Sequence, residues 1–219
     1  SEDWIKNGRQ GAFEVNNFTS PAFVARVNYH GVKGLRVGAS FYYNQTAKNG
    51  TKPWRNTGYK FPVTIVTGDL QYKGFNNNLI VRGNAVYGNL GASGALTTIN
   101  NSSSAASGYP NTTVAQNAVS YGGEAGYNIG SFFHSKAPRI YPFIRYEYYN
   151  PMEKTEANTG LLADKRFQVS AVTAGLNYYA LPNLVIKADY THRSIGGGKY
   201  NDENLVSVGI AYIGWFIKK

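Results

Sequence analysis

The feature that most constrains this chain is the way its connections alternate in length. Nine segments alternate polar and apolar residues, most of them over the roughly 9–11 residues that a tilted strand needs to cross a bilayer. Short turns follow the first, third, fifth and seventh segments, and long polar loops follow the second, fourth, sixth and eighth. A soluble sandwich has no reason to sort its connections in this way, whereas a membrane barrel carries short turns on one side and long loops on the other. The predicted strands are 23–30, 35–44, 62–73, 79–87, 119–129, 139–149, about 167–179, 184–193 and 205–217.

The hairpin LNYYALPNLVIKADYTHR (176–193) shows the pattern in one place. A turn at 180–183 separates two strands, and beyond it the odd positions of 187–193 read K, D, T, R while the even positions of 186–192 read I, A, Y, H. Successive strand residues point to opposite faces, so one face is charged and the other is apolar. A soluble hairpin would lay the apolar face on a core, and a barrel hairpin would turn it to lipid.

Composition supports β-structure, but it does not decide between a soluble sheet and a membrane barrel. The chain has 18 Tyr, 11 Phe and 25 Gly, and its mean hydropathy is only −0.35. No apolar run approaches the roughly 18 residues of a membrane helix, which does not exclude a barrel. The net charge is +10, but the charges are spread singly through alternating strands. This spread argues against a nucleic-acid partner, which needs a basic patch.

Aromatic residues gather near both ends of the predicted strands, with smaller residues between them. Such rings form interfacial girdles in a membrane barrel, although tyrosine is also common in strands generally. The tyrosines near the short turns are Tyr29, Tyr72, Tyr127, Tyr178 and Tyr179. Those toward the long loops, with one phenylalanine, are Phe41, Tyr43, Tyr87, Tyr121, Tyr146, Tyr148 and Tyr190.

The count of strands predicts that the barrel extends beyond this chain. Bacterial single-chain barrels have an even number of strands and both termini in the periplasm, and nine strands ending at the short-turn side break that rule. We therefore expect 1–219 to be a single β-barrel domain, incomplete at its N-terminus, with the C-terminus on the periplasmic side. Residues 1–20 are expected to be an external loop or lead-in segment. The long loop 88–117 is expected either outside the barrel or folded into its pore.

Three stretches resemble the last strands of the phosphate-selective porins of the O/P type. They are PFIRYEYYN (142–150), VTAGLNYYALPNLVIKADY (172–190) and LVSVGIAYIGWF (205–216). The resemblance covers about residues 139–217, and it is looser over residues 20–133. The resemblance implies an outer-membrane barrel of about 16 strands that forms homotrimers and takes up small anions passively. The chain departs from the usual ending, because Lys218 and Lys219 follow the last aromatic residue.

If the apolar parity faces lipid, the opposite parity faces the lumen and supplies the candidate site. Arginine and lysine there would favour anions, because the arginine fork binds phosphate or carboxylate with two hydrogen bonds. The alternative is wall packing, in which arginines pair with carboxylates on neighbouring strands, for example Glu124 with Arg82 or Arg145, and Asp189 with an adjacent basic group. Strand 167–179 shows mixed parity, which predicts a bulge or register change. The candidate pore-lining residues are Arg26, Arg36, Lys73, Arg82, Glu124, Arg145, Glu147, Lys187, Asp189 and Arg193.

Enzyme signatures are missing from the sequence, so we expect no catalytic residues, no metal site and no cofactor. His192 lies on the apolar parity, which leaves open a lipid hydrolase with a Ser/His pair near the lipid face. The function expected is that of an outer-membrane porin of a Gram-negative bacterium, through which small polar, preferentially anionic solutes diffuse. Outer-membrane lipid and lipopolysaccharide would surround it. The alternative is a non-conducting barrel that anchors or partners other outer-membrane proteins.

Overall fold

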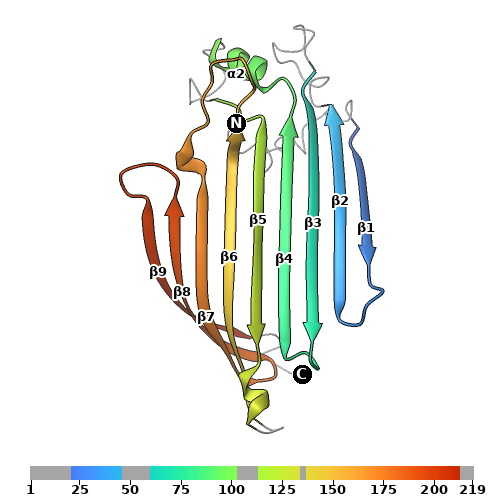
Figure 1. The fold of residues 1–219 in the computed structure, drawn as a ribbon, viewed down its shortest axis with the longest axis vertical. Helices are drawn as coiled ribbons and strands as arrows, with labels where there is room; N and C mark the ends of the chain where they lie inside the picture. Colours follow the sequence, from blue (N-terminus) through green and yellow to red (C-terminus); the bar gives the residue numbers. More distant parts are fainter. Residues whose placement is uncertain (1–20, 46–59, 103–112, 134–136, 213–219) are drawn as a thin grey trace, which may run out of the picture.

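A computed structural model describes residues 21–45, 60–102, 113–133 and 137–212 of the chain. The fold is all-β: nine antiparallel strands form one sheet in which each strand pairs with its neighbours in the sequence (Figure 1). The nine predicted strands are confirmed, except that residues 213–217 of the ninth lie outside the described residues. Their bounds are β1 Phe23–Tyr29, β2 Leu35–Gln45, β3 Pro62–Gly74, β4 Leu79–Leu90, β5 Asn117–Tyr127, β6 Arg139–Lys154, β7 Val169–Leu181, β8 Leu184–Ile195 and β9 Asp202–Tyr212.

The strand ends differ from the prediction in physically interpretable ways. β4 and β6 run further toward the long loops than the alternation indicates, because their last residues pair with β3 and β5. Strand β5 ends at Tyr127, and Asn128 begins the short 3₁₀ helix η3 (Ile129–Phe132). The Asn128 side chain donates to Asn78 and accepts from the backbone of Ile140, so it links the β3–β4 turn to the start of β6 and does not lie in a strand.

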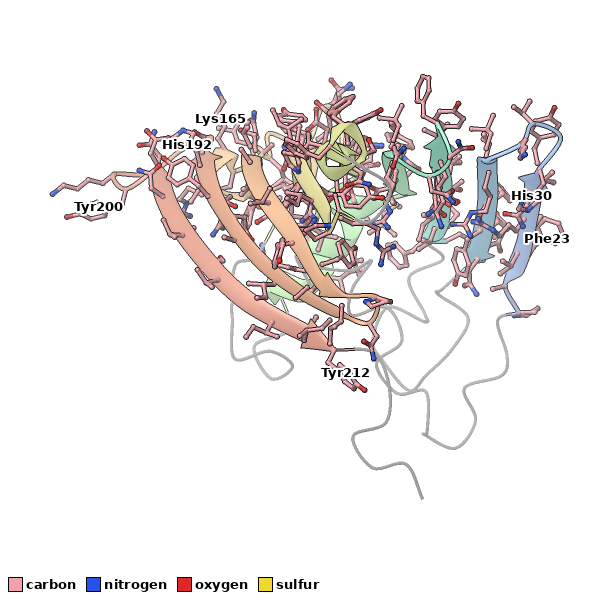
Figure 2. All side chains as sticks on the ribbon, turned by 90° about the horizontal axis from the view of Figure 1, so that it is seen from below. Phe23, His30, Lys165, His192, Tyr200 and Tyr212 are labelled. Carbon is pink, nitrogen blue, oxygen red and sulfur yellow. The ribbon has the colours of Figure 1, made fainter. Side chains whose placement is uncertain are left out.

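The residues of each strand divide between two faces, because side chains alternate along a strand and the pairing is nearly regular. Figure 2 shows the curved sheet with side chains on both sides. Large apolar side chains cover one side, which we call the apolar face, and they are well exposed: Val27 is 72% exposed, Ile144 58% and Val208 76%. The opposite side, the polar face, carries most of the charged residues of the strands.

The mixed parity of strand 167–179 has a simple structural explanation. Gln168 precedes β7, as the last residue of the turn formed by η4 (Lys165–Phe167). From Val169 to Tyr179 the strand pairs regularly with β6 and β8, and its one irregularity lies between Tyr179 and Leu181. The bulge or register change predicted within 167–179 is therefore wrong, because the strand is regular there: Ser170 lies on the apolar face and Thr173 shares the polar face with Arg145.

The long loop after β4 contains an α-helix that the sequence does not predict, α2 (Ser93–Ser102). The helix lies at the long-loop end of the sheet (Figure 1). Its Ala95, Leu96 and Ile99 pack against a small core of buried residues. That core contains Val63 and Leu90, which are paired across β3 and β4 on the polar face.

The helical content does not include a membrane span. Within the ranges that the structure describes, no helix has the length and apolar character needed to cross a bilayer.

Candidate functional site: the charged face of the sheet

All ten candidate residues lie on the polar face, as the register of the sheet shows. Successive pairings place Arg36, Gln71, Arg82, Glu124, Arg145, Thr173 and Thr191 in one continuous row across β2–β8. The neighbouring row joins Asp69, Glu147 and Arg193 through Asn84, Gly122 and Ala171. The alternation of side chains along each strand, with a period of two residues, therefore assigns every candidate to the same side.

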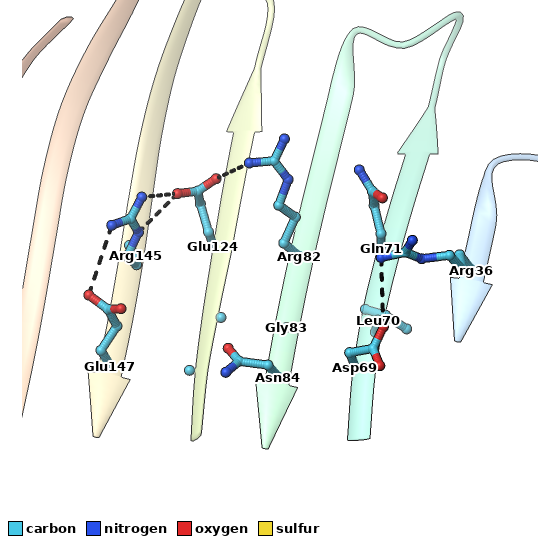
Figure 3. Close-up of a pocket in the computed structure, with 12 residues that line it drawn as sticks. Arg36, Asp69, Leu70, Gln71, Arg82, Gly83, Asn84, Glu124, Arg145 and Glu147 are labelled. Atoms are coloured by element: carbon cyan, nitrogen blue, oxygen red, sulfur yellow. Dashed lines mark hydrogen bonds and ion pairs between the residues drawn. The ribbon is translucent and has the colours of Figure 1, made fainter. Parts of the chain in front are cut away.

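Glu124 is the centre of the larger charged cluster. Its Oε2 accepts from Arg145 Nε at 2.9 Å and from Arg145 Nη2 at 2.5 Å, and its Oε1 accepts from Arg82 Nη1 at 3.5 Å (Figure 3). Arg145 Nη1 also lies 3.9 Å from a carboxylate oxygen of Glu147. One carboxylate thus holds two arginines on its two flanking strands, and the side chain of Glu124 is only 20% exposed.

Asp69 is the centre of a second cluster, formed on β1–β3. Arg26 Nη2 donates to Asp69 Oδ2 at 2.7 Å, and Arg36 Nη2 lies 3.7 Å from Asp69 Oδ1. The contact between Arg26 and Asp69 crosses β2 above Gly38, where a Cβ atom would meet both side chains. Glycine at position 38 is therefore what lets the arginine of β1 reach the aspartate of β3.

The remaining candidates differ in how they are paired. Arg193 donates to Glu203 of β9 at 2.8 Å. Lys73, Lys187 and Asp189 make no ion pair with another residue in the described part of the chain. The expected pairing of Asp189 with a neighbouring basic group is therefore not among the contacts, whereas the expected pairing of Glu124 is present with both arginines.

Two charged residues of the polar face were missed at the level of sequence. Arg139 begins β6 and lies over the Tyr179 ring at 4.6 Å from the centroid. Glu203 lies at the start of β9, before the predicted strand. Arg139 is the first residue of the predicted strand 139–149 and shares the parity of Arg145, so the alternation alone could have found it, whereas Glu203 required strand β9 to be extended to its true start. Tyr179, expected in an aromatic girdle, lies on the polar face and packs edge-on against Tyr141.

The clusters border two adjoining hollows in the polar face. Each has a volume of about 440 Å³, and they share Arg82, Glu124, Arg145 and Glu147 in their walls. The second hollow extends to Lys187, Asp189 and the hydrogen-bonded pair Thr173–Thr191. Such a polar recess offers a small solute positively charged hydrogen-bond donors and negatively charged hydrogen-bond acceptors.

The charged residues do not form a level ring around the sheet. Arg36, Lys73, Arg82 and Lys187 lie close to the short-turn ends of their strands. Arg145 lies further into β6, and Arg193 lies near the long-loop end of β8. The row through Arg36 and Arg145 therefore climbs away from the short turns as it crosses the sheet.

The helix α2 covers the long-loop end of the polar face. The backbone N–H of Gly94, in its first turn, donates to Glu156 of the next long loop at 2.5 Å. The backbone N–H of Val114 donates to Thr97 Oγ1 at 2.9 Å. The described residues of the 88–117 loop thus pack onto the polar face and are held there from two sides.

The described residues contain no group of three or more His, Asp or Glu side chains that could hold a metal ion. No protein-family model matches the sequence, and no curated protein matches it.

Proposed function

We propose that this chain forms wall strands of an outer-membrane β-barrel, and that the barrel lets small polar solutes, with a preference for anions, diffuse through a hydrated lumen. The observation that carries the proposal is the division of the sheet into two faces. Large apolar side chains such as Val27, Ile144 and Val208 stand exposed on one face, and a network of charged side chains covers the other. An exposed apolar surface of this extent needs a partner, and a bilayer is the partner that fits a surface spread over all nine strands.

Closure into a barrel is part of the proposal. The sheet is curved, and its edge strands β1 and β9 each pair on one side only among the described residues (Figures 1 and 2). An open edge presents unpaired backbone groups, and none can stay unpaired in lipid. Pairing of both edges within a closed barrel satisfies these groups and encloses the polar face.

The preference for anions follows from an excess of positive charge on the polar face. Basic side chains outnumber acidic ones there, because Arg26 and Arg36 share Asp69, Arg82 and Arg145 share Glu124, and Lys73 and Lys187 have no ion-pair partner among the described residues. Paired charges largely cancel over distances longer than the Debye length of roughly 8 Å. The preference should therefore be weak and should come from the unpaired cations.

A second function is favoured by the position of α2. The helix packs on the polar face at its long-loop end, where it would narrow or close a lumen. A closed barrel would serve as an anchor or partner subunit for other outer-membrane proteins. Lipid and lipopolysaccharide are proposed neighbours under both functions, and a homotrimer is proposed for the porin.

The reversal potential in a planar bilayer under a salt gradient tests the porin proposal. A stable conductance whose reversal potential shifts modestly toward that of the anion supports it. Folded, membrane-inserted protein that conducts no current would favour the anchoring function. A variant that lacks residues 93–102 separates a plug from a barrel with no pore, because only a plugged barrel gains conductance on deletion.

A further inference from the structure

A cluster of polar side chains interrupts the apolar face at its long-loop end. His192 and Ser194 come from β8, and Asp202 and Asn204 are their direct partners on β9. All four lie on the apolar face, because they share the parity of Tyr190 and Val206. The proposed pore makes no use of these residues.

The contacts within the cluster join a hydroxyl, an imidazole and an amide in series. His192 Nδ1 lies 3.0 Å from Asn204 Oδ1, and His192 Nε2 lies 3.3 Å from Ser194 Oγ. The serine hydroxyl also donates to Asp202 Oδ1 at 2.7 Å, and that oxygen lies 4.0 Å from His192 Nε2. Both ring nitrogens are thus engaged, one by an acceptor and the other by a hydroxyl.

This arrangement assigns a role to each group. A nucleophile within hydrogen-bond reach of a base, which is in turn oriented by a third group, is the pattern of nucleophilic catalysis. Asn204 Oδ1 accepts the Nδ1 proton, which leaves a lone pair on Nε2 and fixes the tautomer. The single proton of the Ser194 hydroxyl is donated to Asp202 Oδ1 in this arrangement, and rotation about the Cβ–Oγ bond turns it toward Nε2 for the reaction. Asp202 lies where it can stabilise the positive charge that His192 gains during a reaction.

The surroundings indicate the class of substrate. His192 is 47% exposed, so the cluster is open to a ligand. Next to it toward the middle of the sheet lie Tyr190 and Val206, which are 48% and 78% exposed, and Val172 pairs with His192 from β7. An acyl chain can lie along these residues while its ester group reaches the hydroxyl at the edge of the apolar band.

We propose that Ser194, His192 and Asn204 form an esterase site for long-chain acyl esters of membrane lipid. Ser194 Oγ bonds to the ester carbonyl carbon while His192 Nε2 takes the hydroxyl proton. The carbon–oxygen bond to the alcohol then breaks, and the leaving oxygen receives that proton. Water attacks the acyl-serine, gives its proton to His192, and the Ser194 Oγ–carbon bond breaks as Oγ is reprotonated. The balance is ester plus water giving carboxylic acid plus alcohol.

The inference shares with the proposed function only the lipid contact of the apolar face, and it is independent of conductance. Ser194 and His192 are the catalytic residues, and Asn204 is a positioning residue that acts through the imidazole. At the level of sequence, the signal is His-x-Ser on the apolar parity of one strand, with an asparagine of the same parity on the next strand.

The test uses the full chain folded in detergent micelles, with p-nitrophenyl palmitate as substrate and a fluorophosphonate as covalent probe of the serine. We expect hydrolysis by the unmodified protein and a probe adduct on Ser194. Ser194→Ala should lower kcat/KM by at least about a thousandfold, and His192→Ala by about 10²–10⁴. Ser170→Ala is the matched control, because Ser170 pairs with Ser194 on the same face and has no contact with His192 among the contacts described; it should keep full activity.

Asn204 is tested by two substitutions. Asn204→Asp keeps an oxygen acceptor for Nδ1 and should retain most of kcat, whereas Asn204→Leu should lower kcat with little change in KM. Far-UV circular dichroism confirms that each variant is folded. The proposal is overturned if the folded protein hydrolyses the ester no faster than Ser194→Ala, or if the probe labels Ser170 as readily as Ser194. The cluster would then be a hydrogen-bonded brace for the β8–β9 hairpin.

Discussion

Glu124 and Arg145 face each other across β5 and β6, with 2.5 Å between Glu124 Oε2 and Arg145 Nη2. Because the same carboxylate also reaches Arg82, two of the candidate anion-selecting arginines share one negative charge. Wall packing therefore accounts for the geometry of these arginines, and selection of anions has to rest on the net charge of the face. The first two predictions follow from this division.

Glu124→Gln should increase the preference for anions. The change removes the negative charge that offsets Arg82 and Arg145 and leaves both guanidinium groups on the polar face. Arg145→Ala should decrease the preference, and the double variant should return close to the original reversal potential, since it keeps the net charge. A double variant that behaves as either single variant would show that position matters more than net charge.

Lys73 and Lys187 should each contribute to the anion preference through the net charge of the polar face. Neither lysine has an ion-pair partner among the described residues, so removing one leaves no buried or unmatched carboxylate behind. We expect Lys73→Gln and Lys187→Gln each to shift the reversal potential toward the cation, with additive effects in the double variant. Lys199→Gln, at the β8–β9 loop, serves as the control and should leave the potential unchanged.

Gly38→Ala should stabilise the protein less than Gly68→Ala does. Alanine replacing glycine in a strand gains about 0.5–1 kcal/mol, and a Cβ at position 68 meets nothing within 4 Å. At position 38 the Cβ pushes apart Arg26 and Asp69, whose partly exposed ion pair is worth up to about 1 kcal/mol. Denaturant unfolding in micelles measures the difference, and equal stabilities would mean that the Arg26–Asp69 contact contributes nothing.

The alternation of side chains predicted a large part of this arrangement. The face of the sheet on which a side chain lies depends only on its position along the strand. The shared face of Arg82, Glu124 and Arg145 could therefore be predicted from the sequence without knowledge of strand pairing. The pairing of charges is different, because it depends on register. The contact of Arg26 with Asp69 spans β1 to β3 and requires that residue 38 have no side chain, which no local pattern reports.

The helix α2 could not be predicted from its own residues. Glycine, serine, threonine and asparagine dominate the segment and are weak helix formers. Contacts from distant segments stabilise it, chiefly Glu156 at its first turn and Val114 at Thr97. The expected resemblance of 139–217 to O/P-type porins concerns the strands and contains no information on this loop.

Asp164 should titrate below the ordinary range of an aspartate. Arg166 donates to its carboxylate from the side chain and the backbone, which lowers the pKa from the usual 3.8. A lowered folded-state pKa stabilises the fold above the unfolded value, and this contribution is lost as pH falls through the folded value. Arg166→Ala should therefore raise the pKa of Asp164 toward 3.8, as measured by carbon-detected NMR of the carboxyl group in micelles. Arg166→Lys, which keeps the charge and the backbone N–H, should give an intermediate value.

Thr97→Val should loosen the packing of the long loop on the polar face. Thr97 is 2% exposed and its hydroxyl accepts the backbone N–H of Val114, so a valine of similar shape leaves a buried donor without a partner. Such a loss costs about 1–3 kcal/mol, and it weakens the contact between α2 and the segment 113–117 that leads into β5.

Thr98→Val is the matched control, because Thr98 lies on the exposed side of the same helix and bonds only to the carbonyl of Gly94 among the contacts described. We expect limited proteolysis of the 88–117 loop to be faster in Thr97→Val than in Thr98→Val, with the strands intact in both. Equal cleavage rates would show that the hydrogen bond from Val114 to Thr97 adds nothing to the apolar contacts and the Glu156 contact that hold the helix. If α2 narrows the lumen, Thr97→Val should also raise single-channel conductance or its noise, which separates a gate made by the loop from a loop that lies clear of the pore.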